Sequence, residues 1–386
     1  MKLRINDLFV YFLLCPSLIL IFIFKLNYII YAIPIFSVLI YILNYYIIKD
    51  SVIAPNKLIY TNEFIALLIY IILVLISTAL NIKNDIYFKS YFRDILIILF
   101  SLMVGMLNMR PNHIHIKVIF LVLTFCYFFS IGFSINFKTI NSLLIADQNN
   151  SNEFTVGFIF GIFVLYFLRS KDWLFLTLSL IISLLASKRV TYLGLIVGLV
   201  YIYTIHKPIL QKLSSKALSV ILLGGTYISL LFVGYFMVEI ADIFLELSEL
   251  DSKISINHVL SSREVFIKIL QTKIQNADIL KFFFGHGPGQ ADRYLQLHLD
   301  PARYDVSELG NPHNDFIKII FDYGWVGAML FIGVIFTLFI HNINYVESYI
   351  YTMAIFLVDN SFVVIYYIII AVLIAQRFDR NEKNIS

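Results

Sequence analysis

Long apolar runs constrain this chain more than any other feature of its sequence. Runs long enough to cross a bilayer as helices lie near residues 8–24, 28–48, 63–80, 94–109, 116–135 and 217–238. Shorter runs lie near 154–168, 173–187 and 190–205, and the last three lie near 323–340, 346–358 and 361–376. A segment surrounded by lipid has to pair its backbone polar groups internally, so these runs predict helices. We expect an all-α polytopic membrane protein with about twelve transmembrane helices.

Composition agrees with that class. Of the 386 residues, 60% are hydrophobic and 14% are charged, which is far from the averages of soluble globular proteins. Both cysteines, Cys15 and Cys126, lie inside apolar runs, so we expect them to pack as small hydrophobic side chains and not to form a disulfide framework. The first run follows Lys2 and Arg4 but contains Pro16, and no small-residue cleavage site follows it. These features predict a retained span and not a cleaved signal peptide.

The distribution of lysine and arginine predicts the orientation. With a cytoplasmic N-terminus, the short cytoplasmic segments and the two termini hold about twice as many of these residues as the outer loops do. An even number of spans agrees with this, although Asp359 and Asn360 mark either a turn between the last two spans or a polar break within one helix. We therefore expect both termini to be cytoplasmic. The chain divides into a bundle over 1–238, a large outward-facing (periplasmic) loop over 239–315 with short helices, and C-terminal spans over 316–386.

Neither a nucleotide-binding run of the Gly-x-x-x-x-Gly-Lys-Ser/Thr type nor an internal repeat is present. A reaction on the outer face would therefore need a donor that is already activated. We expect no cofactor and no nucleic-acid partner.

The large outward-facing loop over 239–315, which we call the insert, carries a glycine-rich motif, Gly285-His286-Gly287-Pro288-Gly289. This spacing needs a sharply turning backbone with little side-chain bulk. The motif lacks a lysine, so it is not a nucleotide-binding loop. Two interpretations stay open: a loop beside a sugar or phosphate, and a simple turn.

His313 lies where the insert returns to the membrane. Pro312 restrains the backbone before it, and Asn314 and Asp315 can cap the apolar helix that follows. A neutral imidazole held near the bilayer surface suits general-base chemistry on an alcohol. The alternative is a histidine in an ordinary capping loop.

Two arginines lie on the same outer side. Lys188 and Arg189 interrupt the apolar stretch between 173 and 205, and cations near hydrocarbon usually have a partner. They either cap a helical hairpin or bind an anionic ligand such as a lipid phosphate, since guanidinium grips phosphate oxygens bidentately. Arg263 precedes a segment with apolar residues at helical spacing, and its alternative role is a solvated ion pair with Glu264.

The order of these motifs resembles the O-antigen ligase and polymerase superfamily of bacterial polysaccharide enzymes. The resemblance rests on an arginine in the outer turn at 187–189 and on the series Ser-Arg, Gly-x-Gly-x-Gly, His-Asn and Gly-x-x-Gly over 261–327. The loop 149–153, which contains Asn152, is similar to an asparagine-bearing loop of that group.

The resemblance implies a GT-C-like fold and an inverting glycosyltransferase that acts on undecaprenyl-diphosphate-linked oligosaccharide. It implies that Arg189 and Arg263 hold the donor diphosphate and that His313 activates the acceptor hydroxyl. The expected substrate-binding residues are Lys188, Asn314, Gly285, Gly287, Gly289 and Asn152. No metal is implied, although an alternative cation site would draw on His286, Asp292, His298, Asp300, Asp305 and Glu308.

Three functions remain open. The first is an O-antigen or capsular repeat-unit polymerase, favoured because the insert lacks a basic cluster for a phosphorylated core acceptor. The second is an O-antigen ligase that transfers polymer to lipid A-core, and the third is a transporter of lipid-linked glycan. A transporter is expected to place its charges at the membrane midplane, whereas these gather at one outer face. The expected setting is the bacterial cytoplasmic (inner) membrane, with membrane lipids, the lipid-linked donor, an acceptor glycan, a repeat-unit flippase and a chain-length regulator as partners.

Overall fold

The structure is a computed structural model. It describes residues 7–24, 36, 57–81, 91, 95–96, 99, 111–130, 157–186, 189–205, 224–225, 228–247, 264–299, 314–339, 347–358 and 365–379. Within these ranges every regular element is a helix. The all-α class expected from the sequence is therefore confirmed for the part of the chain that is described.

The helices follow one another in this order. The N-terminal ones are the π-helical stretch η1 (Leu8–Leu14), α2 (Cys15–Phe22), α4 (Lys57–Leu80) and α6 (His113–Ser130). The middle ones are α8 (Ile159–Arg169), α9 (Trp173–Leu185), α10 (Arg189–Ile205) and α13 (Met237–Leu247). The last ones are α15 (Glu264–Gln275), α16 (Ile279–Phe284), α17 (Gln290–His298), α18 (Asp315–Phe339), α19 (Glu347–Val358) and α20 (Ile365–Asp379).

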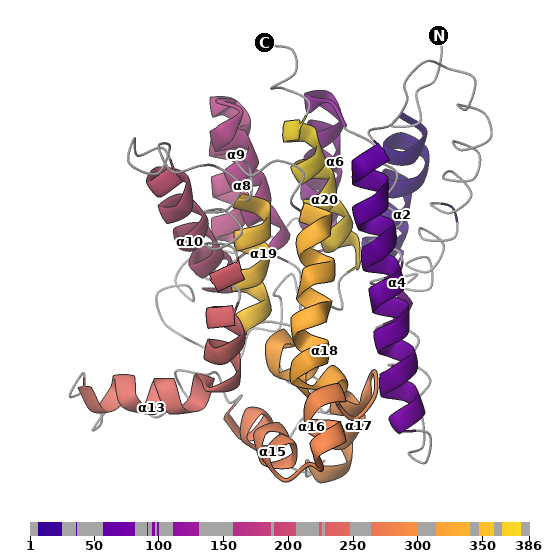
Figure 1. The fold of residues 1–386 in the computed structure, drawn as a ribbon. Helices are drawn as coiled ribbons and strands as arrows, with labels where there is room; N and C mark the ends of the chain where they lie inside the picture. Colours follow the sequence, from indigo (N-terminus) through magenta and orange to yellow (C-terminus); the bar gives the residue numbers. More distant parts are fainter. Residues whose placement is uncertain are drawn as a thin grey trace.

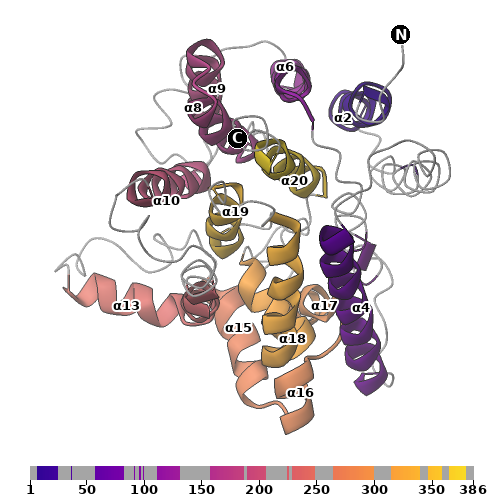
Figure 2. The same cartoon turned by 45° about the horizontal axis from the view of Figure 1, so that its top comes forward.

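The longer helices stand side by side as a bundle, and three short helices gather at one end of it. Figures 1 and 2 show α15, α16 and α17 packed together around the start of α18, beside the C-terminal end of α4. At the opposite end, His115 of α6 binds Asp7, and the Arg377 side chain of α20 lies by Tyr166 of α8. The start of η1 and the end of α20 therefore share the end that faces away from the short helices.

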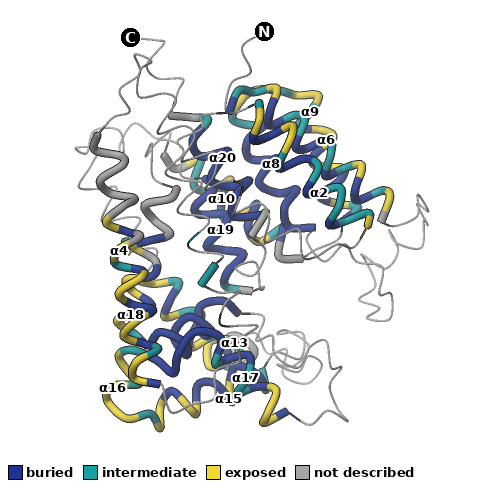
Figure 3. The backbone as a smooth tube through the Cα atoms, turned by 90° about the vertical axis from the view of Figure 1, so that its right-hand side faces the viewer, coloured by how far each residue is buried: buried dark blue, intermediate teal, exposed yellow. Residues whose placement is uncertain are grey.

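The centre of the bundle is formed by α8, α19 and α20. The side chains of 367–375 in α20 are at most 2% exposed, and the Tyr351 hydroxyl of α19 donates to the Phe158 carbonyl just before α8. Figure 3 shows these helices buried, while α4, α9 and α16 have exposed stretches. Apolar residues supply much of that exposed surface, for example Leu75 at 62% and Leu174 at 68%.

Of the helices as described, none combines the length and the hydropathy needed to cross a membrane. The count of about twelve spans is therefore not confirmed by this structure.

A close backbone crossing joins α16 to α18. Gly324 interrupts α18 with a φ of 70°, and Gly285, which ends α16, has a φ of 78°. A Cβ added at Gly324 would lie 2.3 Å from the Phe283 carbonyl carbon, and one added at Gly285 would lie 2.3 Å from the Asp322 carbonyl oxygen. Both positions thus need glycine for two reasons: the backbone has a positive φ, and the neighbouring backbone leaves no room for a Cβ.

We predict that Gly324→Ala destabilises the protein. The substitution places a Cβ against the backbone of α16 and holds alanine in a left-handed conformation, which together should cost about 2 kcal/mol or more of unfolding free energy. Gly333→Ala in the same helix is the matched control, because a Cβ there meets nothing within 4 Å. The thermal unfolding midpoints of the purified full-length variants test this, and equal midpoints for the two would contradict the crossing.

Candidate functional site

The glycine loop at 285–289 is held by α18 through its own backbone. The His286 amide donates to the Phe321 carbonyl at 2.9 Å, and the Gly287 amide donates to the Asp322 carbonyl at 2.9 Å. The Gly289 amide donates to Asp322 Oδ2 at 3.0 Å. These three amides, which a phosphate-binding loop would point at its ligand, are therefore already engaged within the protein.

The end of α4 closes the other side of this loop. Ser77 Oγ donates to the Asp322 carbonyl at 3.0 Å, and Asn81 Nδ2 donates to the Gly285 carbonyl at 3.0 Å. Both donors are buried. The loop is thus clamped between two long helices, and this clamp gives the motif a structural role. Substrate binding by Gly285, Gly287 and Gly289 stays a prediction.

A buried group of charges lies directly behind the loop. Lys318 Nζ of α18 lies 2.7 Å from Asp292 Oδ1 of α17 and 3.7 Å from Asp322 Oδ2. The three side chains are at most 4% exposed. Asp322 Oδ1 also accepts the Ala291 amide at 2.8 Å, so this carboxylate caps the start of α17. We call Asp292, Lys318 and Asp322 the buried charge triad.

The triad takes one carboxylate away from the alternative cation site. Asp292, one of its candidate ligands, binds Lys318 instead. In the described part of the chain no three His, Cys, Asp or Glu side chains are grouped so that they could hold a metal. Asp300, Asp305 and Glu308 lie outside the described residues.

His286 is buried against α18 in its neutral form. Its ring stacks on Phe321 with 4.4 Å between centroids, and its Nδ1 lies 3.3 Å from the Phe321 carbonyl. A carbonyl only accepts, so Nδ1 carries the proton and Nε2 carries the lone pair. Nε2 has no hydrogen-bond partner among the described residues. Burial lowers the pKa of His286 to about 4, so its imidazole is uncharged at neutral pH.

Asn314 caps α18 as the sequence predicts. Its Oδ1 accepts the Ile317 amide at 3.1 Å, and its Nδ2 donates to the Gly234 carbonyl at 2.8 Å. The residue is fully buried. The cap therefore also ties the start of α18 to the helical segment 228–235, and the proposed substrate contact of Asn314 remains a prediction.

The predicted catalytic side chains are not themselves described. Arg263, His313, Lys188 and Asn152 lie outside the described residues, and Arg189 is described only as the first backbone position of α10. Their positions in the sequence can nevertheless be related to helices that are described. Arg263 directly precedes α15, and His313 directly precedes the cap of α18.

The start of α18 and the middle of α15 pack on the same short stretch of chain. Asn314 binds the Gly234 carbonyl, while Gln271 of α15 donates to the Tyr235 carbonyl and to Glu239 Oε2, the latter at 3.1 Å. One turn nearer the start of α15, Lys268 pairs with Glu264 at 2.6 Å and is attracted by the charges of Glu239 and Asp242. Residues 234–242 thus contact the start of α18 and the middle of α15.

The start of α10 reaches the same region through α19. Gly194 of α10 lies against the side chains of Tyr351 and Ile355. One residue further along α19, Phe356 meets Phe316 in the first turn of α18, with 6.4 Å between ring centroids. The helices that follow the three predicted catalytic residues are therefore connected around the start of α18, α10 through α19 and α15 through residues 234–242.

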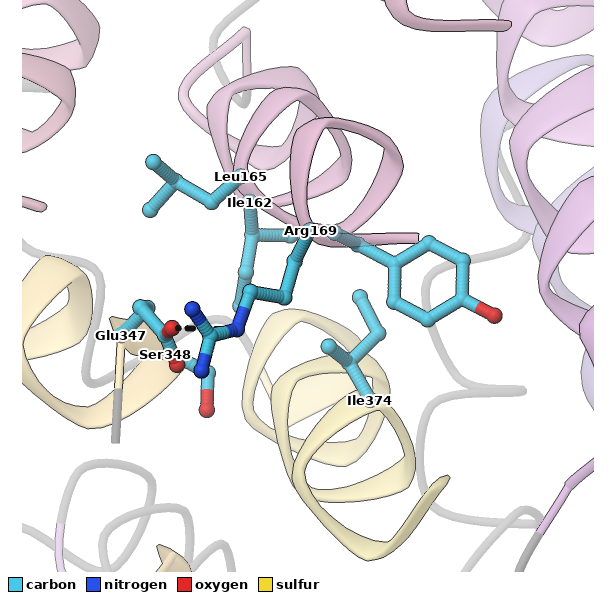
Figure 4. A pocket seen from close by; sticks show the side chains of 7 residues that line it. Ile162, Leu165, Arg169, Glu347, Ser348 and Ile374 are labelled. Carbon is cyan, nitrogen blue, oxygen red and sulfur yellow. Dashed lines mark ion pairs between the residues drawn. The ribbon is translucent and has the colours of Figure 1, made fainter. Parts of the chain in front are cut away.

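A second polar region lies at the opposite end of the bundle. Arg169 Nε of α8 lies 3.3 Å from Glu347 Oε1 of α19, and Figure 4 shows this pair in a small pocket. The pocket is completed by Ile162, Leu165, Tyr166, Ser348 and Ile374. Nearby, Asp172 binds His113 at 2.8 Å and Lys117 at 2.6 Å. These ion pairs join helices of the bundle and lie far from the insert.

Sequence reasoning missed the buried charge triad. Its signal was a lysine in the apolar segment Phe-Ile-Lys-Ile-Ile at 316–320, four residues before an aspartate. A lysine in such a run is costly unless a carboxylate faces it. Spacing alone points to Asp322 on the same helix but does not identify Asp292, which belongs to α17.

We predict that Lys318→Met destabilises the protein by about 3 kcal/mol or more, because it leaves two carboxylates buried without their cation. Adding Asp292→Asn to Lys318→Met should restore part of that loss. Lys268→Met is the control, since its exposed pair with Glu264 should contribute within about 0.5 kcal/mol. Thermal unfolding of the purified variants measures this, and a Lys318→Met midpoint equal to that of Lys268→Met would refute the role of the triad.

We also predict that His286 makes the fold sensitive to acid. The pKa of its imidazole is about 4 in the folded protein, against the ordinary histidine value of 6.5, so the unfolded chain binds the proton first. Stability should fall as the pH drops from about 6.5 to about 4, with no contribution from His286 above that window.

The test compares His286→Asn, which keeps a donor near the Nδ1 position, with His298→Asn, whose histidine is exposed. Unfolding midpoints are followed from pH 7 to pH 4. His286→Asn should lose less stability over this range than wild type, and His298→Asn should follow wild type. An unchanged acid dependence in His286→Asn would rule the mechanism out.

Comparison with protein families adds independent information. Residues 173–332 match the model of a family described as O-antigen ligase. This stretch runs from α9 into α18, and it contains Arg189, Arg263 and His313. The match confirms the resemblance to the O-antigen ligase and polymerase superfamily and supports an enzyme of polysaccharide biosynthesis. The curated proteins give no match to the chain.

Proposed function

We propose that this chain, whose residues 173–332 match the O-antigen ligase family, is a membrane glycosyltransferase. It moves a glycan from undecaprenyl diphosphate to an acceptor sugar, and we favour a repeat-unit polymerase. One observation carries the proposal. The family match spans three separate segments that bear Arg189, Arg263 and His313, and the helices that follow these residues are linked around the start of α18 through α19 and residues 234–242.

The two arginines suit the donor by their charge. Breaking the bond between the anomeric carbon and the diphosphate oxygen places negative charge on the departing diphosphate. Fixed guanidinium groups stabilise that charge most where water is partly excluded, and each can grip two oxygens at once. Arg189 and Arg263 are therefore the groups that hold the diphosphate and favour its departure, with no metal or cofactor required.

In this proposal His313 acts as the general base. The acceptor hydroxyl oxygen attacks the anomeric carbon while its proton passes to the neutral imidazole, and the bond to the diphosphate breaks on the opposite face. A single displacement of this kind inverts the anomeric centre. The buried cap at Asn314 supports the role, because it restrains the backbone directly after the histidine.

The proposed setting is the bacterial cytoplasmic membrane, with both termini in the cytoplasm and α15–α17 in the periplasm. The bias of lysine and arginine favours this orientation. The exposed apolar flanks of α4 and α9 support it, because isolated large apolar side chains are common on soluble proteins but rows of them along a helix are not.

The choice of acceptor rests on the charges of the insert. A ligase has to receive a phosphorylated core, which needs free cations beside the active centre. Among the described lysines of α15–α18, Lys268 pairs with Glu264, Lys281 with Asp278 and Lys318 with Asp292, while Lys273 lies over the Tyr294 ring. This pairing supports the polymerase, which would work beside a repeat-unit flippase and a chain-length regulator. The ligase remains the second candidate because the family description names it, and transport of lipid-linked glycan is third.

We predict that Arg189→Ala, Arg263→Ala and His313→Ala each lower transfer about a hundredfold or more, since each removes charge stabilisation or proton transfer from the transition state. The measurement is the lipopolysaccharide or capsule ladder of a deletion strain complemented with each variant, with expression checked. Lys268→Ala, an exposed cation of the same insert, is the control and should restore a normal ladder.

The wild-type comparison also separates the two enzymes. A deletion strain that leaves core with a single repeat unit identifies a polymerase. One that leaves bare core and long polymer on the lipid carrier identifies a ligase. Normal ladders in all three variants would contradict the active-site assignment for either enzyme.

A further inference from the structure

The chain turns sharply where the bundle meets the insert. Residues 228–235 form a helical segment, and a turn at Phe236, across which the amides of Phe236 and Ile240 still bond to the carbonyls of Phe232 and Phe236, leads into α13. Figures 1 and 2 show α13 lying across the direction of α18 and α20, at the end where α15–α17 gather.

The described part of α13 has two different faces. Phe236, Ile240 and Ile243 are 40%, 43% and 55% exposed, and their spacing puts them on one side of a helix. Glu239 and Asp242 lie on the neighbouring side. Gln271 of α15 donates to Glu239 Oε1 at 3.2 Å, and both acids attract Lys268. The acidic side of α13 therefore interacts with α15, whereas its apolar side is exposed.

The open side continues into an exposed aromatic cluster. Phe232 stacks on Phe236 with 6.3 Å between centroids, and Trp325 of α18 lies 5.5 Å from Phe232 and 6.4 Å from Phe282 of α16. Next to Trp325, the exposed side chains of Val326, Met329 and Leu330 extend the apolar surface along the flank of α18. The aromatic cluster thus lies between the apolar face of α13 and the apolar flank of α18.

We propose that α13 lies in the headgroup region of the outer leaflet, with Phe236, Ile240 and Ile243 in the acyl boundary. The proposal rests on the membrane location proposed above. An amphipathic helix that lies across a bundle and is joined to its apolar flank by tryptophan and phenylalanine has the features of an interfacial helix with an aromatic belt. A protein partner would leave the continuity with the flank of α18 unexplained.

The acidic side defines the kind of lipid surface. Glu239 and Asp242 repel anionic headgroups, and none of the described residues of α13 is a lysine or arginine. Most interfacial helices use such cations to bind anionic lipid. We therefore assign α13 to a zwitterionic surface that it reaches by apolar burial alone.

This contact gives the lipid a role in positioning the active centre. Gln271 ties α15 to Glu239, and Asn314 ties α18 to Gly234. Arg263 and His313 stand directly before these two helices. The depth of α13 in the leaflet thus sets the height of both residues relative to the lipid-borne diphosphate.

Depth-dependent fluorescence quenching tests the contact. Both tryptophans, Trp173 and Trp325, are replaced with phenylalanine, and single tryptophans are introduced as Ile243→Trp, Leu75→Trp and Thr272→Trp. Leu75 is an exposed residue of α4, and Thr272 is an exposed residue of α15. The full-length variants are reconstituted in phosphatidylcholine vesicles that carry bromine either near the glycerol end or near the middle of the acyl chains.

We expect shallow bromine to quench Ile243→Trp about twofold more than deep bromine does, and to leave Thr272→Trp nearly unquenched. Leu75→Trp should be quenched by bromine at either depth. If Ile243→Trp is quenched no more than Thr272→Trp, the proposal fails, whether water, another protein or a second copy covers the face. A marked gain in quenching of Ile243→Trp with brominated anionic lipid over phosphatidylcholine would overturn the zwitterionic assignment.

Quenching needs no turnover, so the two proposals can fail separately. If Leu75→Trp is unquenched, the membrane location itself is wrong and both proposals fall. If Leu75→Trp is quenched while Ile243→Trp is not, only the placement of α13 is wrong. If Ile243→Trp behaves as expected while the ladders of the three active-site variants are normal, the assignment of catalytic residues is wrong and the placement of α13 stands.

Discussion

The insert depends on one residue of α18 more than on any other. The Asp322 carboxylate caps α17, and its carbonyl accepts from Gly287 of the loop and from Ser77 of α4. Two residues later, Gly324 lets the backbone of α16 cross α18 at a distance that excludes a Cβ. Lys318, one turn earlier, offsets the buried charge. Two of the short helices, α16 and α17, are thus fixed to the bundle through this part of α18.

The contacts of Asp322 and Gly324 give the insert a rigid base on which reactive side chains can be held in place. The charges of the bundle divide into two groups, one at the Arg169–Glu347 pair and one around the insert. The buried charge triad and the neutral His286 stabilise the side of the bundle that carries the insert, because their polar groups face the protein interior. The reactive groups that we assign, Arg189, Arg263 and His313, stand at or directly before the starts of α10, α15 and α18, and packed helices of this kind are a rigid scaffold that can present catalytic side chains.

The sequence predicts the helical class and the Asn314 cap, because apolar runs and capping residues are local signals. It also leads to the resemblance to the O-antigen ligase and polymerase superfamily, which the family match over residues 173–332 supports, because the order of the motifs can be read without knowing how the helices pack. It leaves the glycine motif open between loop and turn, and only the structure shows that the amides of His286, Gly287 and Gly289 meet α18. The partner of Lys318 on α17 could not be predicted either, because it is 26 residues away in the chain and is set by tertiary packing.

The most direct measurement is transfer by the purified protein in vesicles that contain undecaprenyl-diphosphate-linked repeat units and no lipid A-core. The account predicts that wild type lengthens the lipid-linked glycan with inversion at the new linkage. It also predicts that Arg189→Ala, Arg263→Ala and His313→Ala fail to do so while folding normally. A well-folded wild-type protein that lengthens nothing here, yet transfers polymer when lipid A-core is added, would make it a ligase. Transfer at the wild-type rate by the three variants would contradict the central claim.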